Sequence, residues 1–245
     1  MKKLFTALAL GVAALAAQAT TDVTALLKSA DRYRAGSNDN LQVETQVTTF
    51  NRDGSPDKER RYTVFAQADH KSLVLMRSPA EAGQKVLMLG DDFWLLLPGS
   101  QRPLRITPSQ KLLGDASTGD IATLSWAEDY TGTLVGEEQC EKEKCTHLSL
   151  QAARKGLTYA RIELWVGRAR GEPLKAELYV QSDKLAKLAS FVMDKPGGQV
   201  SEMVLSDKLS SHKETRVRYL SRQAKQVPEA WLNPMFLARN PALEQ

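Results

Sequence analysis

The hydrophobic pattern of the chain changes its period near residue 40. Over residues 21–34, apolar side chains recur at helical spacing, with Thr21 or Asp22 as the N-cap and Gly36 just beyond the end. These features predict one amphipathic helix. From residue 41 onward, apolar and polar residues alternate instead, which is typical of β-strands that place one face against a core.

Short turn sequences separate the alternating segments. Residues 51–56, with the sequence NRDGSP, join the first two segments as a hairpin. Because the other connections are also too short to hold crossover helices, we expect antiparallel pairing. The strands predicted on this basis span residues 41–49, 59–68, 71–77, 84–90, 92–97, 102–107, 130–136, 146–152, 158–166, 173–180, 186–194, 199–206 and 214–222.

Residues 108–129 interrupt the alternation and predict a helical or looped insert. An antiparallel sheet of ten or more strands must curl to remain stable, and its concave face needs a cover. We therefore predict a mainly β fold, an antiparallel incomplete barrel with helices covering the concave face. Since ten Pro and fifteen Gly provide no long linker, residues 20–245 are expected to form a single domain.

The first nineteen residues have the form of a secretory signal peptide. Lys2 and Lys3 make a basic n-region, residues 4–16 an apolar h-region, and residues 17–19 an A-x-A cleavage site. A membrane anchor is the alternative, but about thirteen apolar residues make roughly 20 Å of helix, short of the roughly 30 Å hydrocarbon core. We predict cleavage after Ala19 and export to a bacterial periplasm.

The charge balance bears on the class of partner. The chain has 33 basic and 29 acidic residues, and 31 basic residues remain once Lys2 and Lys3 are removed. This near balance offers no basic surface for a polyanion, so no nucleic acid partner is expected. The apolar and charged contents, 42% and 25%, are those of a globular protein.

The two cysteines, Cys140 and Cys145, flank four residues between two predicted strands. In an oxidising compartment, such a close pair favours a disulfide that holds a hairpin together. Loop-closure entropy limits its contribution to roughly 2 kcal/mol. A redox or metal site is less well supported, because the spacing is C-x4-C and only His147 is near.

Motifs of catalysis are absent from the sequence. There is no G-x-S-x-G elbow, no H-E-x-x-H and no phosphate-binding glycine loop. His70, His147 and His212 are scattered singly near strand ends and are expected at the surface. Asp91 and Asp92 are placed where a hairpin turn favours Gly and Asp. We therefore predict a protein that is not an enzyme and that needs no cofactor and no metal ion.

Three predicted strands are apolar on both faces. They contain residues 73–76, 86–89 and 93–97, so both sides of this part of the sheet require a cover. One interpretation covers one face with the helices and the other with loops or a partner subunit. The other interpretation makes part of this surface the wall of a hydrophobic ligand cavity, for which Met76 and Met88 would be adaptable components.

Candidate cavity residues follow from the alternation. Where one face of a strand is charged, the opposite face must point inward, because charges do not enter a dry interior without partners. Both faces of the strand of residues 93–97 are apolar, so its pattern does not show which side chains point inward. Trp94 and Leu96 of this strand are included as candidates, together with apolar residues of neighbouring strands and of the insert. The predicted ligand-binding set is Val43, Val47, Leu75, Met88, Trp94, Leu96, Leu113, Trp126, Ile162, Leu164, Leu178 and Val180.

Four short motifs resemble the LolA-like family of periplasmic outer membrane lipoprotein-sorting proteins. They are S-P-x-x-x-G at residues 78–83, W-x-x-x-P at 94–98, G-x-x-x-x-G-D at 114–120 and N-P-x-F at 233–236. The likeness extends from about residue 40 to 240. The resemblance implies an incomplete antiparallel barrel that is lidded by helices and encloses a hydrophobic cavity for acyl chains.

Together these features lead to one functional hypothesis and one alternative. The hypothesis is a periplasmic carrier or binding protein for a lipid or lipid-modified protein, with an acyl chain or a lipoprotein as ligand and an inner-membrane transporter as a candidate partner. Burial of an acyl chain of about fourteen carbons provides roughly 10 kcal/mol gross, so no catalytic group is needed. The alternative is an accessory periplasmic subunit of an envelope transport or efflux assembly that acts by protein–protein contact.

Overall fold

The structure is a computed structural model that describes residues 22–36, 40–122, 125–141, 143–207 and 211–243. The predicted signal peptide and its cleavage position lie outside these residues. Within them, no helix is long and apolar enough to cross a membrane.

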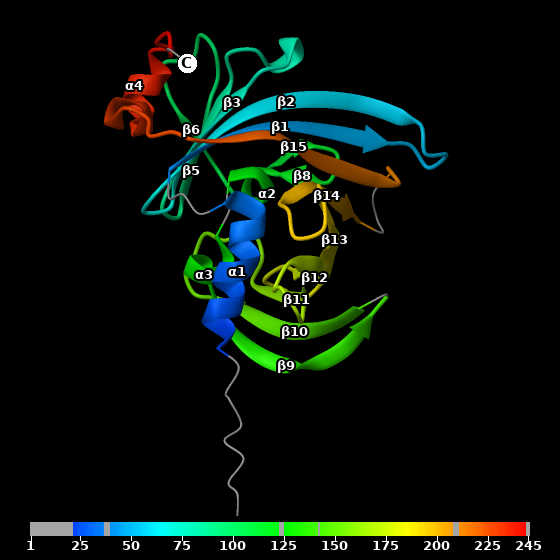
Figure 1. The fold of residues 1–245 in the computed structure, drawn as a ribbon. Coiled ribbons are helices and arrows are strands. Elements are labelled where there is room, and N and C mark those ends of the chain that lie inside the picture. The colour runs from blue at the N-terminus through cyan, green and yellow to red at the C-terminus, as the bar shows by residue number, and fades with distance from the viewer. Residues whose placement is uncertain (1–21, 37–39, 123–124, 142, 208–210, 244–245) are drawn as a thin grey trace, which may run out of the picture.

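One antiparallel sheet of thirteen strands dominates the fold, in the order β6-β5-β4-β3-β2-β1-β15-β14-β13-β12-β11-β10-β9. It curls strongly but does not close, so β6 and β9 remain its two edges (Figure 1). The predicted mainly β half-barrel is therefore confirmed. The strands are β1 Leu41–Phe50, β2 Pro56–Gln67, β3 Lys71–Met76, β4 Lys85–Leu89, β5 Asp92–Leu96, β6 Leu104–Ile106, β9 Tyr130–Cys140, β10 Glu143–Ala152, β11 Arg161–Gly167, β12 Pro173–Tyr179, β13 Leu185–Met193, β14 Val200–Ser206 and β15 Glu214–Ala224.

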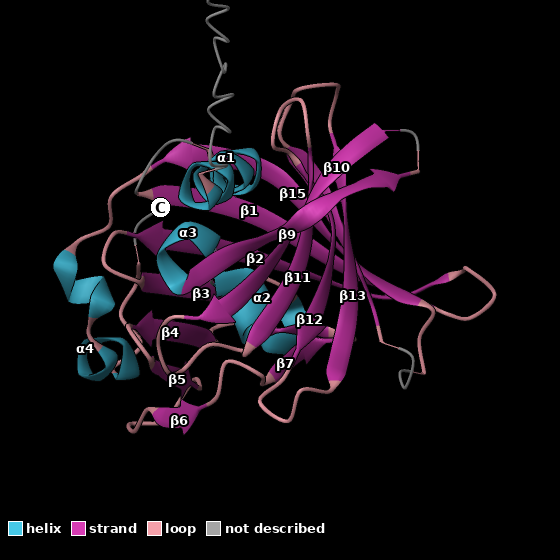
Figure 2. Cartoon of the chain, turned by 90° about the horizontal axis from the view of Figure 1, so that it is seen from below, coloured by secondary structure: helices cyan, strands magenta, loops and turns pink. Residues whose placement is uncertain are grey.

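Helix α1 and the helices of the insert lie on the concave side of the sheet (Figure 2). Helix α1, Val23–Ala35, begins at Asp22, whose side chain accepts a hydrogen bond from the Ala25 amide at 3.1 Å. It ends at Gly36, whose φ of 89° lies in the left-handed region. This is the helix that the apolar spacing predicts.

The predicted insert folds into small elements that enter the concave side. A two-stranded hairpin of β7, Lys111–Leu113, and β8, Ala116–Ser117, leads into the short helices α2, Thr118–Ala122, and α3, Trp126–Asp129. All five residues of α2 are buried. The insert therefore fills the half-barrel with its own chain and, with α1, forms the main core against the concave face.

The convex face of β3–β5 is covered by the C-terminal segment, which the sequence did not predict. The 3-10 helix η2, Glu229–Leu232, and helix α4, Pro234–Ala238, pack there as a second core cluster. Trp231 packs edge to face against Phe65, with ring centroids 5.6 Å apart. Asn233 of the N-P-x-F motif caps α4 by accepting hydrogen bonds from the amides of Met235 and Phe236. The chain itself thus covers both faces of the apolar strands.

The disulfide between Cys140 and Cys145 is confirmed. The bond joins β9 to β10 at the end of their hairpin, with the two Cα atoms 5.7 Å apart. Disulfides persist in oxidising compartments, which fits an exported protein.

Candidate functional site

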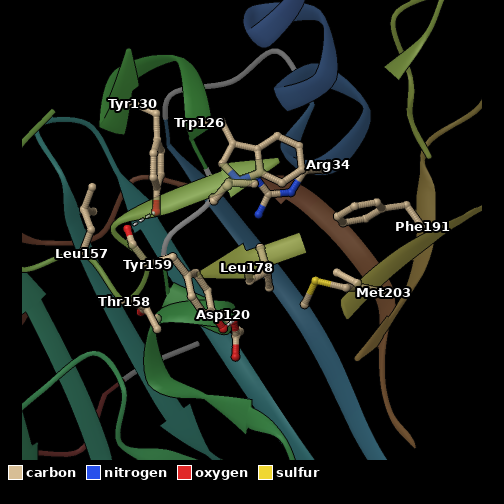
Figure 3. A pocket seen from close by; sticks show the side chains of 13 residues that line it. Arg34, Asp120, Trp126, Tyr130, Leu157, Thr158, Tyr159, Leu178, Phe191 and Met203 are labelled. Atoms are coloured by element: carbon tan, nitrogen blue, oxygen red, sulfur yellow. Dashed lines mark hydrogen bonds between the residues drawn. The ribbon is translucent and has the colours of Figure 1, made fainter. Parts of the chain in front are cut away.

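A cavity lies inside the curved sheet, between the insert helices and strands β11 to β14 (Figure 3). Its wall is mainly apolar and aromatic, with a carboxylate at one end. The free volume is about 40 Å³, room for about three water molecules and too small for an acyl chain. The lining residues are Arg34, Gly119, Asp120, Trp126, Tyr130, Leu157, Thr158, Tyr159, Ile162, Leu178, Ala189, Phe191 and Met203.

Trp126 of α3 closes one side of this cavity. Its indole packs edge to face against Phe191 of β13, with ring centroids 5.6 Å apart. The guanidinium carbon of Arg34 lies 3.8 Å from the Trp126 ring centroid, a cation–π contact that joins α1 to α3. Met203 lies directly opposite Phe191 in the β13–β14 ladder. Since a thioether side chain adapts easily to new neighbours, this wall can reshape without a change in the sheet.

Asp31 of α1 holds α3 in place. Its carboxylate accepts hydrogen bonds from the amides of Trp126 at 2.9 Å and Ala127 at 2.8 Å, and from Ser125 Oγ at 3.2 Å. Arg34 Nη1 lies 3.5 Å from Asp31 Oδ1. Burial raises the pKa of Asp31, and the charge of Arg34 and these hydrogen bonds offset only part of that effect. We call the contacts of Asp31 with residues 125–127 the Asp31 latch.

A buried ion pair fixes the opposite end of the cavity. Asp120 of α2 accepts hydrogen bonds from Lys187 Nζ at 2.6 Å, Tyr159 OH at 2.6 Å and Ser117 Oγ at 2.7 Å. Burial alone would raise the pKa of Asp120, but the charge of Lys187 and these hydrogen bonds outweigh it, so the pKa is lowered. The carboxylate therefore stays ionised and ties the insert to β13.

The two glycines of the G-x-x-x-x-G-D motif, Gly114 and Gly119, are required by close contacts between the insert and the sheet. A Cβ on Gly114 would collide with the side chains of Thr49 and Thr215, and one on Gly119 would collide with Thr158. Gly114 also has a φ of 56°, which favours glycine. The two glycines let the insert approach the sheet closely enough for Asp120 to reach its partners.

A larger, open groove of about 480 Å³ lies on the other side of α3, between α1 and the ends of strands β1 to β4. Its lining is part apolar, with Leu41 and Met88 among the contributors, and part charged, with both basic residues such as Lys28 and acidic residues such as Asp69 and Glu128. Trp126 of α3 lines the small cavity, and the next residue, Ala127, lines the groove. Helix α3 is thus the partition between the two hollows.

Most of the predicted ligand-binding residues do face the concave side. Seven belong to the main core cluster, namely Val43, Val47, Met88, Trp126, Ile162, Leu164 and Leu178. Of these, Trp126, Ile162 and Leu178 line the small cavity and Met88 lines the groove, while the other three are packed in the core around them.

Four predicted residues require correction and one cannot be placed. Leu75, Trp94 and Leu96 lie on the convex face, against the C-terminal segment. The inward positions are taken by Val74 and Met76 in β3 and by Phe93 and Leu95 in β5. Val180 is half-buried in the turn after β12, since a register shift at residues 178–179 ends the alternation there. The side chain of Leu113 lies outside the described residues.

Apart from Trp126, the polar and aromatic members of the cavity wall were not among the predicted residues. Arg34 and Asp120 were not candidates because charged residues are usually solvated. Met203 has the parity opposite to Glu202 in β14, so its inward position could have been found from the alternation. Phe191 shares the face of Lys187 in β13, and the charge of Lys187 points to the wrong face for it. For Tyr130, which follows the insert, and Tyr159, in the loop before β11, no sequence signal identified an inward orientation.

The three histidines do not form a joint site. His70 contacts Asp129, His147 lies between Glu138 and Glu163, and His212 contacts Asp57. The position of His147 differs from the expectation of a surface residue near a strand end, because it is in the middle of β10 and largely buried. Across the described part of the chain, no group of three or more His, Cys, Asp and Glu side chains could hold a metal ion.

Fold and cavity together define a helix-lidded antiparallel half-barrel with an apolar interior, and solved structures share it. A LolA superfamily protein from Nitrosomonas europaea is 28% identical, with a TM-score of 0.78, over 87% of this chain and 98% of that one. A putative outer membrane lipoprotein-sorting protein domain from Vibrio parahaemolyticus is 17% identical, with a TM-score of 0.66, over 88% and 98% of the two chains. A DUF1329 family protein from Desulfovibrio piger is 22% identical, with a TM-score of 0.67, over 86% and 95%.

A family model described as "-like: Uncharacterized protein" matches residues 68–239. No curated protein matches the chain significantly. These similarities show that the chain belongs to the LolA-like family.

Proposed function

We propose that the chain is a periplasmic carrier or binding protein for a lipid or a lipid-modified protein, whose acyl chain enters the concave interior. The observation that carries the proposal is the mainly apolar cavity bordered by α3, a short helix that one carboxylate holds in place. Proteins of the same fold include a putative outer membrane lipoprotein-sorting protein domain. The disulfide and the predicted signal peptide support residence in the periplasm.

The size of the cavity makes α3 central to this function. About 40 Å³ accommodates no acyl chain, but the open groove of about 480 Å³ begins directly behind α3. Displacement of Trp126 toward solvent would join the two hollows into one trough, apolar at the cavity end. The charged side chains that line the groove, among them Lys28, Arg32 and Glu128, would then meet the polar part of the cargo.

The free energy gained by burying an acyl chain can be compared with the free energy lost when α3 is displaced. Burial of an acyl chain of about fourteen carbons contributes roughly 10 kcal/mol gross. The contacts that hold Trp126 and the start of α3 are a few hydrogen bonds, each contributing on the order of 1 kcal/mol net, an aromatic pair of about 1 kcal/mol and the Arg34 cation–π contact of about 1 kcal/mol. The end of α3 is anchored separately, because the buried Asp129 pairs with Arg154 at 2.8 Å. Gross ligand burial therefore exceeds the cost of displacing Trp126 and the start of α3 while Asp129 stays in place.

The alternative function, an accessory subunit acting by protein contact, loses its original support. That hypothesis needed a partner to cover the convex face of β3–β5, but η2 and α4 already cover it. An inner-membrane transporter remains a candidate partner for cargo delivery.

The experiment uses neighbouring residues on opposite faces of β13. Phe191 lines the cavity, whereas Val192 points outward and is 46% exposed. Full-length chains are expressed for export, and binding of a fluorescent fatty acid is titrated. We expect Phe191→Asp to abolish binding and Val192→Asp to leave it unchanged. Both must show the wild-type circular dichroism spectrum; binding retained in a folded Phe191→Asp variant would reject the cavity as the site.

A further inference from the structure

The two edges of the sheet are built very differently. At one edge, β6 has three residues, follows Pro103, and carries Arg105 in an ion pair with Asp92 at 2.5 Å. Short length, proline and charge are the usual means by which proteins protect an edge strand. At the other edge, β9 has eleven residues and contains no Lys, Arg or Pro. Its first five residues, 130–134, carry none of these protections, whereas a register shift at Val135 and the charged Glu137 and Glu138 follow them.

The backbone groups that β9 directs outward can be assigned from its pairing with β10. The amide of Ala153 donates to the carbonyl of Asp129 at 2.9 Å. Because hydrogen-bonded and non-hydrogen-bonded pairs alternate in an antiparallel ladder, Tyr130, Gly132 and Leu134 direct their N–H and C=O groups away from β10. A register shift opposite residues 147–148 interrupts the ladder at Val135. The regular free edge thus spans residues 130–134.

The side chains of this edge are neutral and partly apolar. Residues 130–136 include no charged side chain, and Leu134 and Val135 are 45% and 56% exposed. The acidic residues that follow already have partners, since Glu137 pairs with Arg168 at 2.8 Å and Glu138 with His147 at 3.0 Å. Such an edge offers no charge to select a basic or acidic partner strand.

The same stretch is complementary to itself. If two copies pair antiparallel about Gly132, Tyr130 of each copy faces Leu134 of the other, and Thr131 faces Thr133. Aromatic–aliphatic and threonine pairs are favourable cross-strand neighbours, and no like charges oppose each other. All three outward-directed residues of each copy then find backbone partners. Figure 1 shows β9 at the margin of the molecule, with no described strand beyond it.

We propose that the protein forms a two-fold symmetric dimer in which the β9 edges of two copies pair antiparallel through residues 130–134. A two-fold interface of this kind is isologous and closes after two subunits. The two half-barrels then share one continuous sheet, and Leu134 is covered by the other copy.

Matched substitutions of exposed leucines test the proposal. Leu134 on β9 is 45% exposed and Leu220 on β15, an inner strand of the sheet, is 46% exposed. Molecular mass is measured by analytical ultracentrifugation over a wide range of concentration, with the full chain expressed for export. We expect the wild type and Leu220→Lys to approach twice the monomer mass and Leu134→Lys to remain monomeric. Leu134→Pro, which removes an outward N–H and no bond to β10, should also be monomeric.

Hydrogen exchange provides a readout that other interfaces would not share. In the wild type, the amides of Tyr130, Gly132 and Leu134 should exchange more slowly as concentration rises, whereas those of Thr131 and Thr133, which face β10, should not change. A wild type that stays monomeric at every concentration would overturn the proposal. So would a dimer that persists in both folded Leu134 variants, because its interface would then lie elsewhere.

Discussion

Removal of the Asp31 latch is the most informative perturbation of the lid. The Asp31→Ala variant leaves the amides of Trp126 and Ala127 without their acceptor. Loss of a helix N-terminal acceptor costs about 1 kcal/mol, and a second unsatisfied buried donor adds about 1 kcal/mol. We therefore expect the opening of α3 to become easier by about 2 kcal/mol.

That change has a kinetic consequence for ligand uptake. Since 1.4 kcal/mol corresponds to a factor of ten, the population with α3 displaced should rise roughly 30-fold. If opening limits uptake, the association rate of a fluorescent fatty acid, measured by stopped flow, should rise by up to the same factor.

The control is Asp22→Ala, which removes the N-cap of α1 but makes no contact with α3. It should lower the free energy of unfolding by about 1 kcal/mol and leave the association rate unchanged. An Asp31→Ala variant that is destabilised yet takes up the probe at the wild-type rate would refute the role of α3 as the gate.

Three further predictions concern stability. Replacement of both Cys140 and Cys145 by serine should lower the free energy of unfolding by no more than about 2 kcal/mol, as measured by urea denaturation; two free thiols titrated in the unfolded wild type would contradict the disulfide. Asp120→Asn strands a buried ammonium and should cost about 3 kcal/mol at neutral pH. Because the pKa of Asp120 is lowered in the folded state, its contribution is fully present above the unfolded value near 3.9 and is lost as pH falls through the folded pKa. The difference between wild type and variant should therefore be constant from pH 7 to about pH 4 and shrink below that; a difference that grows on acidification would show that the carboxylate is not ionised. Gly119→Ala should lower the melting temperature because its Cβ meets Thr158, whereas Gly136→Ala, with open space around it, should change it little.

Periodicity alone predicted the strands of the main sheet because most of them bury one face and leave the other wet. Ile162, Leu164 and Leu178 could be assigned to the concave side for this reason. The assignment from alternation fails in strands that do not expose one face to water. Both faces of β5 are covered, so nothing in the local sequence distinguishes Phe93 from Trp94.

The C-terminal cover could not be predicted from the sequence. Trp231 and Leu237 belong to elements of four and five residues, which are too short to show a helical period. Their partners lie far earlier in the chain, since Phe65, which packs on Trp231, is 166 positions before it. The charged residues of the cavity were missed for a related reason, because only the fold brings Asp120 next to Lys187.

The most direct test of the carrier function is whether the exported protein is purified with a bound lipid. The full chain is expressed for export, purified without detergent, and its organic extract is analysed by mass spectrometry beside that of folded Phe191→Asp and Val192→Asp variants. The account predicts an acyl-chain molecule in near-equimolar amount with the wild type and with Val192→Asp, and none with Phe191→Asp. Wild-type protein that carries no lipid, and that binds no fatty acid even after Asp31→Ala frees α3, would contradict it.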